Sequence, residues 1–340
     1  MRYRTKRNLT LFAVLVLVSA SFAPLYGVIF VPDFSDRPIF SYVLDGLIGG
    51  TFLWSGVILL WPSKICAPLR RLAVPWHVLM LLVYTALSIP FTEFVGGLWH
   101  SDQTAPLNDF DPGLSLFLYI LVIVFGALVV IEVASIIGPR ILVNFLAGRY
   151  HKPAEERRVF LFVDLVGSTA MARELGDMGV QRLLTRFFFD LGKPVADNSG
   201  EIHAYVGDMV IITWPYEKGL HNARCVRCFF GIQDALEKNA KSYEKEFGLR
   251  PQIRAGLHGG PVIVSECGDF KKSVVYFGDT MNTTGRLEGV AKALKQDLVI
   301  TRALLDDLTL SQGVVAHNLE AVTLRGHKNT TEIAALSRTK

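Results

Sequence analysis

The stretch VFLFVDLVGST, residues 159–169, carries the most information about the fold. Five apolar residues run directly into Asp164, and the turn after them contains Gly167, Ser168 and Thr169. A run with this many apolar residues predicts a buried strand. A buried strand that ends on a carboxylate over a glycine and two hydroxyl residues raises the question of what the carboxylate binds.

A second aspartate follows in EIHAYVGDMVIITW, residues 201–214. This stretch predicts a hairpin with Asp208 in its turn, and the surrounding segments alternate strand, helix, strand, strand, helix, strand. That order is ferredoxin-like. If the hairpin lies beside the first strand, Asp164 and Asp208 meet at one end of the sheet, where Mg²⁺ could bind between them. Each aspartate taken alone is better explained as a helix cap.

The turn at residues 165–169 opens a predicted helix, so its backbone N–H groups form a cradle for an anion. A third stretch, YFGDTMNTTGRLEGVAKAL (residues 276–294), predicts a helix from about Thr280. Asn282 and Arg286 are four residues apart and share one face. An amide beside a guanidinium suits a ribose and a phosphate, although a solvated polar face is the ordinary alternative.

The first 140 residues hold most of the apolar excess in this chain of 340 residues, which is 51% hydrophobic. Four apolar runs, at about residues 9–30, 42–61, 73–91 and 114–137, are each long enough to cross a bilayer as a helix. We therefore predict a four-helix transmembrane domain over residues 1–137. A signal peptide is the alternative for the first run, but its apolar stretch is longer than such peptides need.

Basic residues set the predicted orientation. They concentrate before the first run, between the second and third, and after the fourth. Both termini and the second half of the chain are thus predicted to be cytoplasmic, in a multi-pass protein of a bacterial inner membrane. The net charge of +4 is too small to indicate a nucleic-acid partner.

Residues 138–157 connect the two halves. Ile141, Leu142, Phe145 and Leu146 form an apolar stripe at helical spacing, followed by charged residues. An amphipathic surface helix explains this pattern; a helix that dimerises and transmits signals also explains it, and the catalytic residues that follow favour the second explanation. Cys225 and Cys228 form a CxxC, but no second ligand pair follows at zinc spacing, so we interpret them as core residues.

The motifs in residues 158–340 together resemble the catalytic domain of class III nucleotidyl cyclases. FVDLVGST and VGDMV resemble the family's two metal motifs, and GDTMNTTGRLE its transition-state helix. IRAGLHGGPV and VTLRGHK resemble the strands that lie between these motifs and close the domain. The resemblance covers more than half of the chain, and it implies an α+β ferredoxin-like catalytic domain after the membrane helices.

The resemblance also implies a role for each matching residue. Asp164, Asp208 and the carbonyl of Leu165 would bind two Mg²⁺ or Mn²⁺ ions, and Asn282 and Arg286 would orient the ribose and stabilise the α-phosphate. The phosphate-binding set would be Gly167, Ser168, Thr169, Arg254 and Arg325. The implied reaction is cyclisation of ATP to 3′,5′-cyclic AMP and pyrophosphate, in a homodimer whose two chains share each site.

Two positions depart from the family pattern. Ala204 and Val275 stand where the family usually has residues that read the base, and neither side chain can hydrogen-bond to a purine. His203 and Tyr276 are their neighbours, but strand alternation predicts that they point to the opposite face. A guanylate or mixed-purine cyclase, and a degenerate domain that binds nucleotide without turnover, therefore remain as alternatives.

Overall fold

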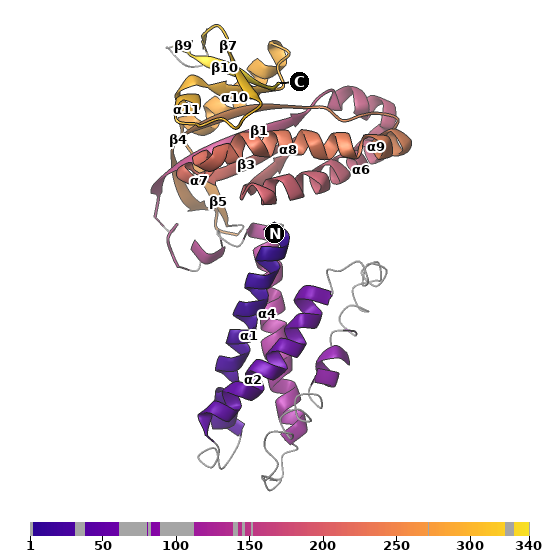
Figure 1. The fold of residues 1–340 in the computed structure, drawn as a ribbon, viewed down its shortest axis with the longest axis vertical. Helices are drawn as coiled ribbons and strands as arrows, with labels where there is room; N and C mark the ends of the chain where they lie inside the picture. Colours follow the sequence, from indigo (N-terminus) through magenta and orange to yellow (C-terminus); the bar gives the residue numbers. More distant parts are fainter. Residues whose placement is uncertain are drawn as a thin grey trace. The chain divides into compact units, whose positions relative to one another are not determined.

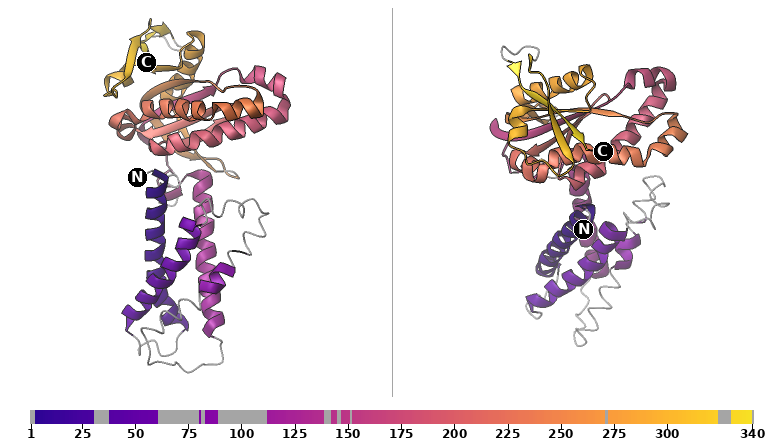
Figure 2. Two further views of the ribbon diagram at one scale, coloured as in Figure 1. Left: turned by 45° about the vertical axis from the view of Figure 1, so that its right-hand side comes forward. Right: turned by 45° about the horizontal axis from the view of Figure 1, so that its top comes forward.

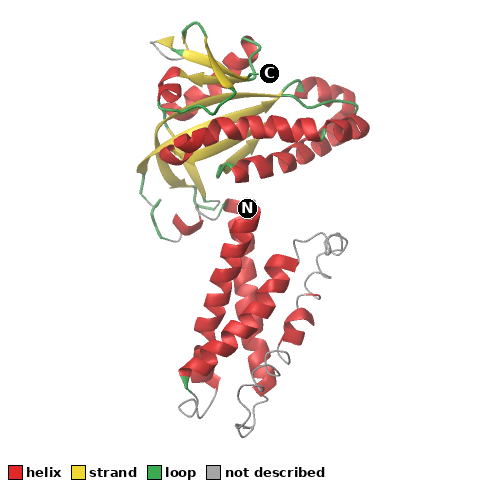
Figure 3. Cartoon of the chain, viewed as in Figure 1, coloured by secondary structure: helices red, strands yellow, loops and turns green. Residues whose placement is uncertain are grey.

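The computed structural model describes residues 3–30, 38–60, 80, 83–88, 112–138, 142–144, 147–150, 152–270, 272–323 and 330–339. The chain divides into two compact units, Met1–Ser135 and Ile136–Lys340. The first unit is helical and the second mixes helices with strands (Figure 1 and Figure 3). A helical unit thus precedes a unit of mixed helices and strands along the chain.

The helices of the first unit are α1 (Tyr3–Phe30), α2 (Ile39–Trp54), which continues as the π-helical turn η2 (Ser55–Leu60), and α4 (Pro112–Ile137). They share an apolar cluster that includes Leu15, Trp54 and Val124. The indole nitrogen of Trp54 donates a hydrogen bond to Ser19 Oγ at 2.9 Å. Gly46 and Gly50 of α2 lie against α1. A Cβ added to either glycine would come within 2.7 Å of an atom of α1, so the absence of a side chain permits this close contact between the helices.

Two helices are long and apolar enough to cross a bilayer, Asn8–Ile29 and Ile39–Ile58. A shorter apolar segment, Leu116–Ile131, lies within α4. The third predicted run, at residues 73–91, falls mostly outside the described residues. The structure thus supports two candidate spans among the described residues, and the prediction of four is not confirmed.

The second unit is built on an eight-stranded sheet in the order β2-β3-β1-β4-β6-β10-β7, with β5 paired to β4. Its first four strands are β1 (Ala154–Leu165), β2 (Glu201–Val206), β3 (Met209–Pro215) and β4 (Ile253–Cys267). The pairs β2–β3, β3–β1 and β1–β4 are all antiparallel. This order and direction confirm the ferredoxin-like prediction.

Two long helical segments cover one face of the sheet, α6 (Ser168–Asp197) and α8 (Arg224–Lys238), which lie side by side (Figure 2). Alternate residues of β1, among them Val159, Leu161 and Val163, are fully buried against them. The helical periodicity of residues 219–247 predicts one long helix, but the structure divides this segment into α7 (Tyr216–Leu220), η4 (His221–Ala223), α8 and α9 (Ala240–Phe247). Asn222 and Ala223 adopt positive φ at the first break, and Asn239 leaves the helical conformation between α8 and α9.

The other face of β1 carries Phe160 and Phe162, which belong to a second cluster with Ile211, Val264 and Tyr276. Helix α10 (Asp279–Ala293) packs on this face against β4. Its backbone comes so close to Gly256 that a Cβ there would lie 2.6 Å from both Glu288 N and Thr284 O. A glycine is therefore required at this contact, and it fixes how near the helix lies to the sheet.

The remaining elements extend the sheet: β5 (Ser273–Phe277), β6 (Leu298–Thr301), α11 (Arg302–Asp306), β7 (Val314–Asn318) and β10 (Ile333–Arg338), with a separate pair β8 (Val322–Thr323) and β9 (Thr330–Thr331). The sequence did not predict β7. Strand β1 begins at Ala154, so the last residues of the predicted connector are already part of the sheet.

Cys225 and Cys228 are both fully buried on α8, as free thiols in the apolar core. Burial raises the pKa of Cys225 to about 12. A buried, protonated thiol is a poor metal ligand and a poor nucleophile. The interpretation of these cysteines as core residues agrees with this environment.

Candidate active site

Asp164 and Asp208 meet at one edge of the sheet. Asp164 is the second-last residue of β1, and Asp208 lies in the turn between β2 and β3. The β1–β3 pairing ends at Val163 opposite Val210, which brings the turn beside the strand end. Burial, followed by the charge of Asp208 and a hydrogen bond to it, raises the pKa of Asp164 to about 7.

Two carboxylates in contact repel each other when both are ionised, and after burial this repulsion is the next cause of the raised pKa of Asp164. A divalent cation between them would remove it, and Mg²⁺ commonly uses one or two carboxylates together with substrate phosphates. Among the described residues no group of three or more His, Cys, Asp or Glu could hold a metal by protein ligands alone. The donor set thus fits an ion that shares its coordination with a phosphate.

The turn that follows β1 has the geometry of an anion cradle. Gly167 has φ +79°, a left-handed conformation that suits glycine, and α6 begins at Ser168 directly after it. The first N–H groups of a helix have no partner within the helix. The side chain of Leu165 is buried in the core, so only its backbone faces the carboxylate edge.

Arg254 lies directly opposite Asp164 in the β1–β4 register, so both side chains are on the same face of the sheet. Its positive charge also lowers the pKa of Glu288, although burial of that carboxyl raises the pKa by more. Arg254 therefore lies at the carboxylate edge, where a triphosphate would need a cation. Arg325, the other predicted phosphate-binding cation, lies outside the described residues.

Asn282 and Arg286 lie on α10, as predicted, four residues apart. Asn282 is exposed and Arg286 half-buried. Two other α10 residues, Glu288 and Lys292, carry charges that act on Asp164. Glu288 and Lys292 were not predicted from the sequence as part of the site, although their spacing of four residues on the predicted helix is the usual signal of an ion pair.

Ala204 and Val275, the two positions that usually read the base, direct their side chains to different faces of the sheet. Ala204 packs against the cluster of Phe160, Phe162 and Tyr276. Val275 is between Val274 and Tyr276, which both contact that cluster, so alternation directs its side chain to the other face. The expected alternation holds for Tyr276, which faces away from Val275. It fails for His203, whose ring lies 4.8 Å from the Tyr276 ring, on the side of the cluster that Ala204 also contacts.

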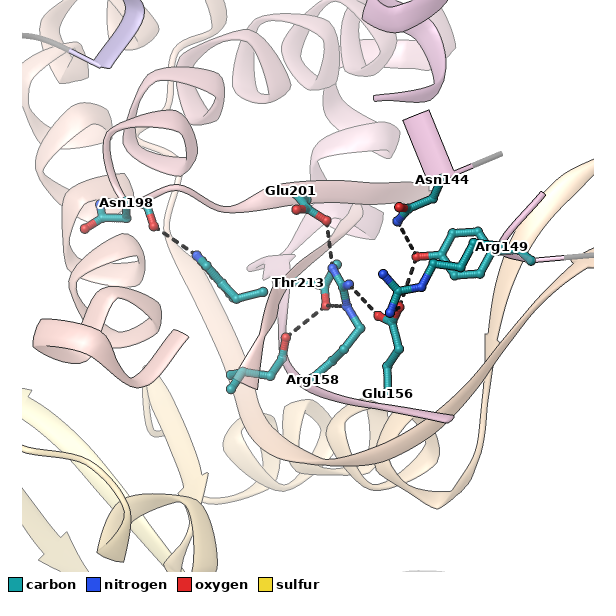
Figure 4. Close-up of polar contacts among 10 residues, drawn as sticks. Asn144, Arg149, Glu156, Arg158, Asn198, Glu201 and Thr213 are labelled. Carbon is teal, nitrogen blue, oxygen red and sulfur yellow. Dashed lines mark hydrogen bonds and ion pairs between the residues drawn. The ribbon is translucent and has the colours of Figure 1, made fainter. Parts of the chain in front are cut away.

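A buried polar network supports this face of the sheet (Figure 4). Arg158 is only 1% exposed. It donates hydrogen bonds to Glu201 Oε2 at 2.7 Å, Thr213 Oγ1 at 3.0 Å and Glu156 Oε2 at 3.1 Å. Its guanidinium carbon lies 4.9 Å from the centre of the Tyr276 ring. The network thus compensates a buried charge and holds one side of Tyr276 in place.

The network also reaches the segment before β1. Tyr150 donates a hydrogen bond to Glu156 Oε1 at 3.1 Å and accepts one from Asn144 Nδ2 at 2.7 Å. Its backbone carbonyl accepts a hydrogen bond from Glu266 N at 2.9 Å. Residues of the connector are therefore joined to β1 and β4.

Comparison with known proteins identifies the family of the chain. Residues 150–336 match the family described as the adenylate and guanylate cyclase catalytic domain, so the chain belongs to that family. Adenylate cyclase 2 of Rhizobium meliloti (strain 1021) is 39% identical over 228 residues, which are 67% of this chain and 62% of that protein. An adenylate cyclase of Anabaena cylindrica is 25% identical over 181 residues, 52% of this chain and 35% of that protein.

This chain thus spans less than two thirds of the length of either relative. Among solved structures, a bacterial light-regulated adenylyl cyclase has the same fold over 69% of this chain and 71% of its own, with a TM-score of 0.55 and 19% identity. That similarity bears on the fold alone.

Proposed function

We propose that this protein is a membrane-bound adenylate cyclase that converts ATP to 3′,5′-cyclic AMP and pyrophosphate. The observation that carries the proposal is the contact between Asp164 and Asp208 at the sheet edge of a cyclase-family domain. The similarity to a protein named adenylate cyclase 2 favours ATP as the substrate. The proposed reaction is attack of the ribose 3′-oxygen on the α-phosphorus, with release of pyrophosphate.

Asp164, Asp208 and the carbonyl of Leu165 would hold Mg²⁺ or Mn²⁺, two ions per site. Bound there, the ions would supply Lewis-acid activation of the 3′-hydroxyl and charge for the triphosphate. The N–H groups at Gly167, Ser168 and Thr169 would receive phosphate oxygens at the start of α6. Arg254, opposite Asp164, would neutralise phosphate charge, and Arg325 is proposed for the same task.

Asn282 would fix the ribose, and Arg286 would hydrogen-bond to the α-phosphate oxygens as their charge grows during attack. Asn282 is exposed on the surface of α10. A second chain that presents its α10 to this edge would complete the site. We therefore propose a homodimer with two equivalent sites.

For the N-terminal half we propose four membrane spans over residues 1–137, a connector over 138–157 and the catalytic domain over 158–340. The two candidate spans and the basic flanking segments support an inner-membrane protein with both termini in the cytoplasm. The contact of Tyr150 with Glu156 supports a role for the connector in transmission, because it joins that segment to the catalytic sheet.

A mixed-purine or guanylate cyclase is the second candidate. The observation that favours it is the apolar surrounding of Ala204, which offers no side-chain hydrogen bond at the usual base-reading position.

The test is turnover by the purified full-length protein in lipid, with ATP or GTP and with Mg²⁺ or Mn²⁺. Cyclic AMP and pyrophosphate in equal amounts are expected from ATP, and Asp208→Ala should abolish both. Equal rates with GTP would support the mixed-purine candidate. A folded dimer that binds nucleotide and makes no cyclic product would contradict both and support a signalling domain without turnover.

A further inference from the structure

Strand β2 is held to the sheet along one side. It is the first strand in the sheet order, so in the described part of the chain its outer edge has no neighbouring strand. Its ladder with β3 is also interrupted: Ile202 and Ala204 pair with consecutive residues of β3, so His203 is an extra residue in a bulge. A short edge strand with an interrupted ladder opens more easily than a central strand. The turn after β2 carries Asp208, so whatever holds β2 in place also positions a proposed metal ligand.

One arginine joins three neighbouring strands at the other end of β2 (Figure 4). Arg158 of β1 donates hydrogen bonds to Thr213 Oγ1 of β3 at 3.0 Å and to Glu201 Oε2 of β2 at 2.7 Å. Glu201 is the first residue of β2. The arginine is fully buried, so water does not compete for these bonds. Arg158, Thr213 and Glu201 therefore form a clamp that fastens the start of the edge strand, across β3, to β1.

The clamp is also reached from the connector. Arg158 donates a third bond to Glu156 Oε2 at 3.1 Å, and the other oxygen of that carboxylate accepts a bond from the Tyr150 hydroxyl at 3.1 Å. Tyr150 is buried, and its hydroxyl accepts a bond from Asn144 in turn. Hydrogen bonds between side chains thus run without a break from the connector to the first residue of β2.

Stability alone does not account for this arrangement. A buried ion pair often contributes no more to stability than apolar side chains of the same volume, because its charges lose their hydration. A fully bonded polar network does, however, fix one arrangement of the strands that it joins. Arg158 and Asp164 lie on the same face of β1, about 20 Å apart at the usual rise per residue. The clamp and the carboxylate edge are therefore at opposite ends of the same strands.

We propose that Arg158 is a positioning residue for Asp208, and that Tyr150 regulates it through Glu156. With Tyr150 bound to Glu156, the clamp holds the start of β2 and keeps the hairpin turn beside the end of β1. When the connector withdraws Tyr150, Glu156 turns away from Arg158 and the β2–β3 hairpin opens more often. The effect on turnover rests on the proposed function, in which Asp208 binds a metal ion, whereas the link between connector and hairpin does not.

Amide hydrogen exchange of the full-length protein in lipid, without nucleotide, tests the link. Tyr150→Phe keeps the ring and removes the hydroxyl that binds Glu156. Loss of one hydrogen bond in the chain should make the amides of residues 205–211, at the hairpin turn, exchange about tenfold faster. If Tyr150 only packs the connector, exchange would rise at residues 144–156 and stay at the wild-type rate in the hairpin, which would overturn the proposal.

A double variant distinguishes one connected chain from two separate effects. Glu201→Gln weakens the clamp on the other side of Arg158 and should also raise exchange at residues 205–211 about tenfold. If Arg158 connects Tyr150 to Glu201, the two substitutions interrupt the same chain, and the double variant should exchange about as fast as either single variant. An increase of roughly a hundredfold, the product of two independent effects, would overturn the proposal.

Tyr243→Phe is the matched control. Tyr243 is also buried and donates a hydrogen bond to a carboxylate, Asp190 Oδ2 at 2.9 Å, but it joins α9 to α6. Its substitution should raise exchange in α9 and leave residues 205–211 at the wild-type rate. If Tyr150→Phe does not fold, Glu156→Gln interrupts the same chain and is judged by the same criteria.

The rate of cyclic AMP formation then tests the positioning of Asp208. It should be lower in Tyr150→Phe and in Glu201→Gln and unchanged in Tyr243→Phe. Faster exchange in the hairpin with an unchanged rate would overturn the role of Arg158 as a positioning residue. If the wild type itself makes no cyclic product, the proposed function fails, and the exchange measurements still decide whether the connector controls the hairpin.

Discussion

The contact between Gly256 and α10 makes Gly256→Ala the most informative single substitution. An added Cβ would lie 2.6 Å from Glu288 N and from Thr284 O, and 2.8 Å from Leu287 Cβ. The first two atoms are helix backbone, which cannot rotate away as a side chain can. Ordinary contact begins at 3.4 Å, so α10 must move outward by roughly 1 Å.

That movement would carry Asn282 and Arg286 with it, because both lie on α10. A displacement of about 1 Å in a catalytic group can cost on the order of 10²-fold in rate. The overpacked contact should also destabilise the domain by about 1–3 kcal/mol. We therefore expect Gly256→Ala to remain folded at 25 °C, with kcat for cyclic AMP formation about 10²-fold lower.

The assay is the initial rate of cyclic AMP formation by the full-length protein in lipid, together with a thermal melt. Gly192→Ala is the matched control, since no atom lies within 4 Å of the added Cβ and the position is helical. It should keep the wild-type rate and gain about 0.5–1 kcal/mol in stability. A Gly256→Ala protein with the wild-type rate would show that this contact does not position α10.

Three other substitutions or treatments test separate parts of the structure. Removal of divalent ions with a chelator should stop turnover, and Mg²⁺ or Mn²⁺ should restore it in wild type but not in Asp208→Ala; recovery in the variant would exclude Asp208 as a ligand. Arg158→Met should lower the free energy of unfolding by about 3 kcal/mol, because Glu156 and Glu201 lose their buried cation; an unchanged melting temperature would show that the network contributes little. An alkylating reagent should modify Cys267, which is partly exposed, and spare Cys225 and Cys228 in the native protein; mass spectrometry would reveal the opposite order if the core were open.

The sequence predicted the strands and the carboxylate edge well because both depend on local patterns. The apolar run before Asp164 and the hairpin turn at Asp208 fix where each strand ends, and ferredoxin-like pairing then brings the two ends together. The long helix predicted over residues 219–247 failed because the two breaks lie at Asn222–Ala223 and at Asn239. Asparagine favours turns and positive φ, so both breaks had a local signal that the periodicity outweighed. Apolar periodicity continues across both breaks.

The base-reading face was mispredicted for a related reason. Alternation assumes an uninterrupted strand, and the bulge at His203 adds one residue without leaving a glycine or proline to announce it. The positions of Glu288 and Lys292 near Asp164 also depend on how α10 crosses β4. Gly256 sets this crossing through its contact with Glu288, a residue 32 positions away in the chain. These features follow from tertiary contacts that a single sequence does not display.

We propose that two chains share one cyclase site, with Asp164 and Asp208 from one chain and Asn282 and Arg286 from the other. Complementation tests it directly. Asp208→Ala and Arg286→Ala chains, each inactive alone, are co-expressed with different tags, and the mixed dimers are assayed for cyclic AMP.

A mixed dimer has one site with both substitutions and one site with neither, so a random mixture should recover about a quarter of the wild-type rate. Purified mixed dimers should recover about half. Recovery at these levels is expected if the two chains share each site. Mixed dimers that are as inactive as either parent would contradict a site shared between chains.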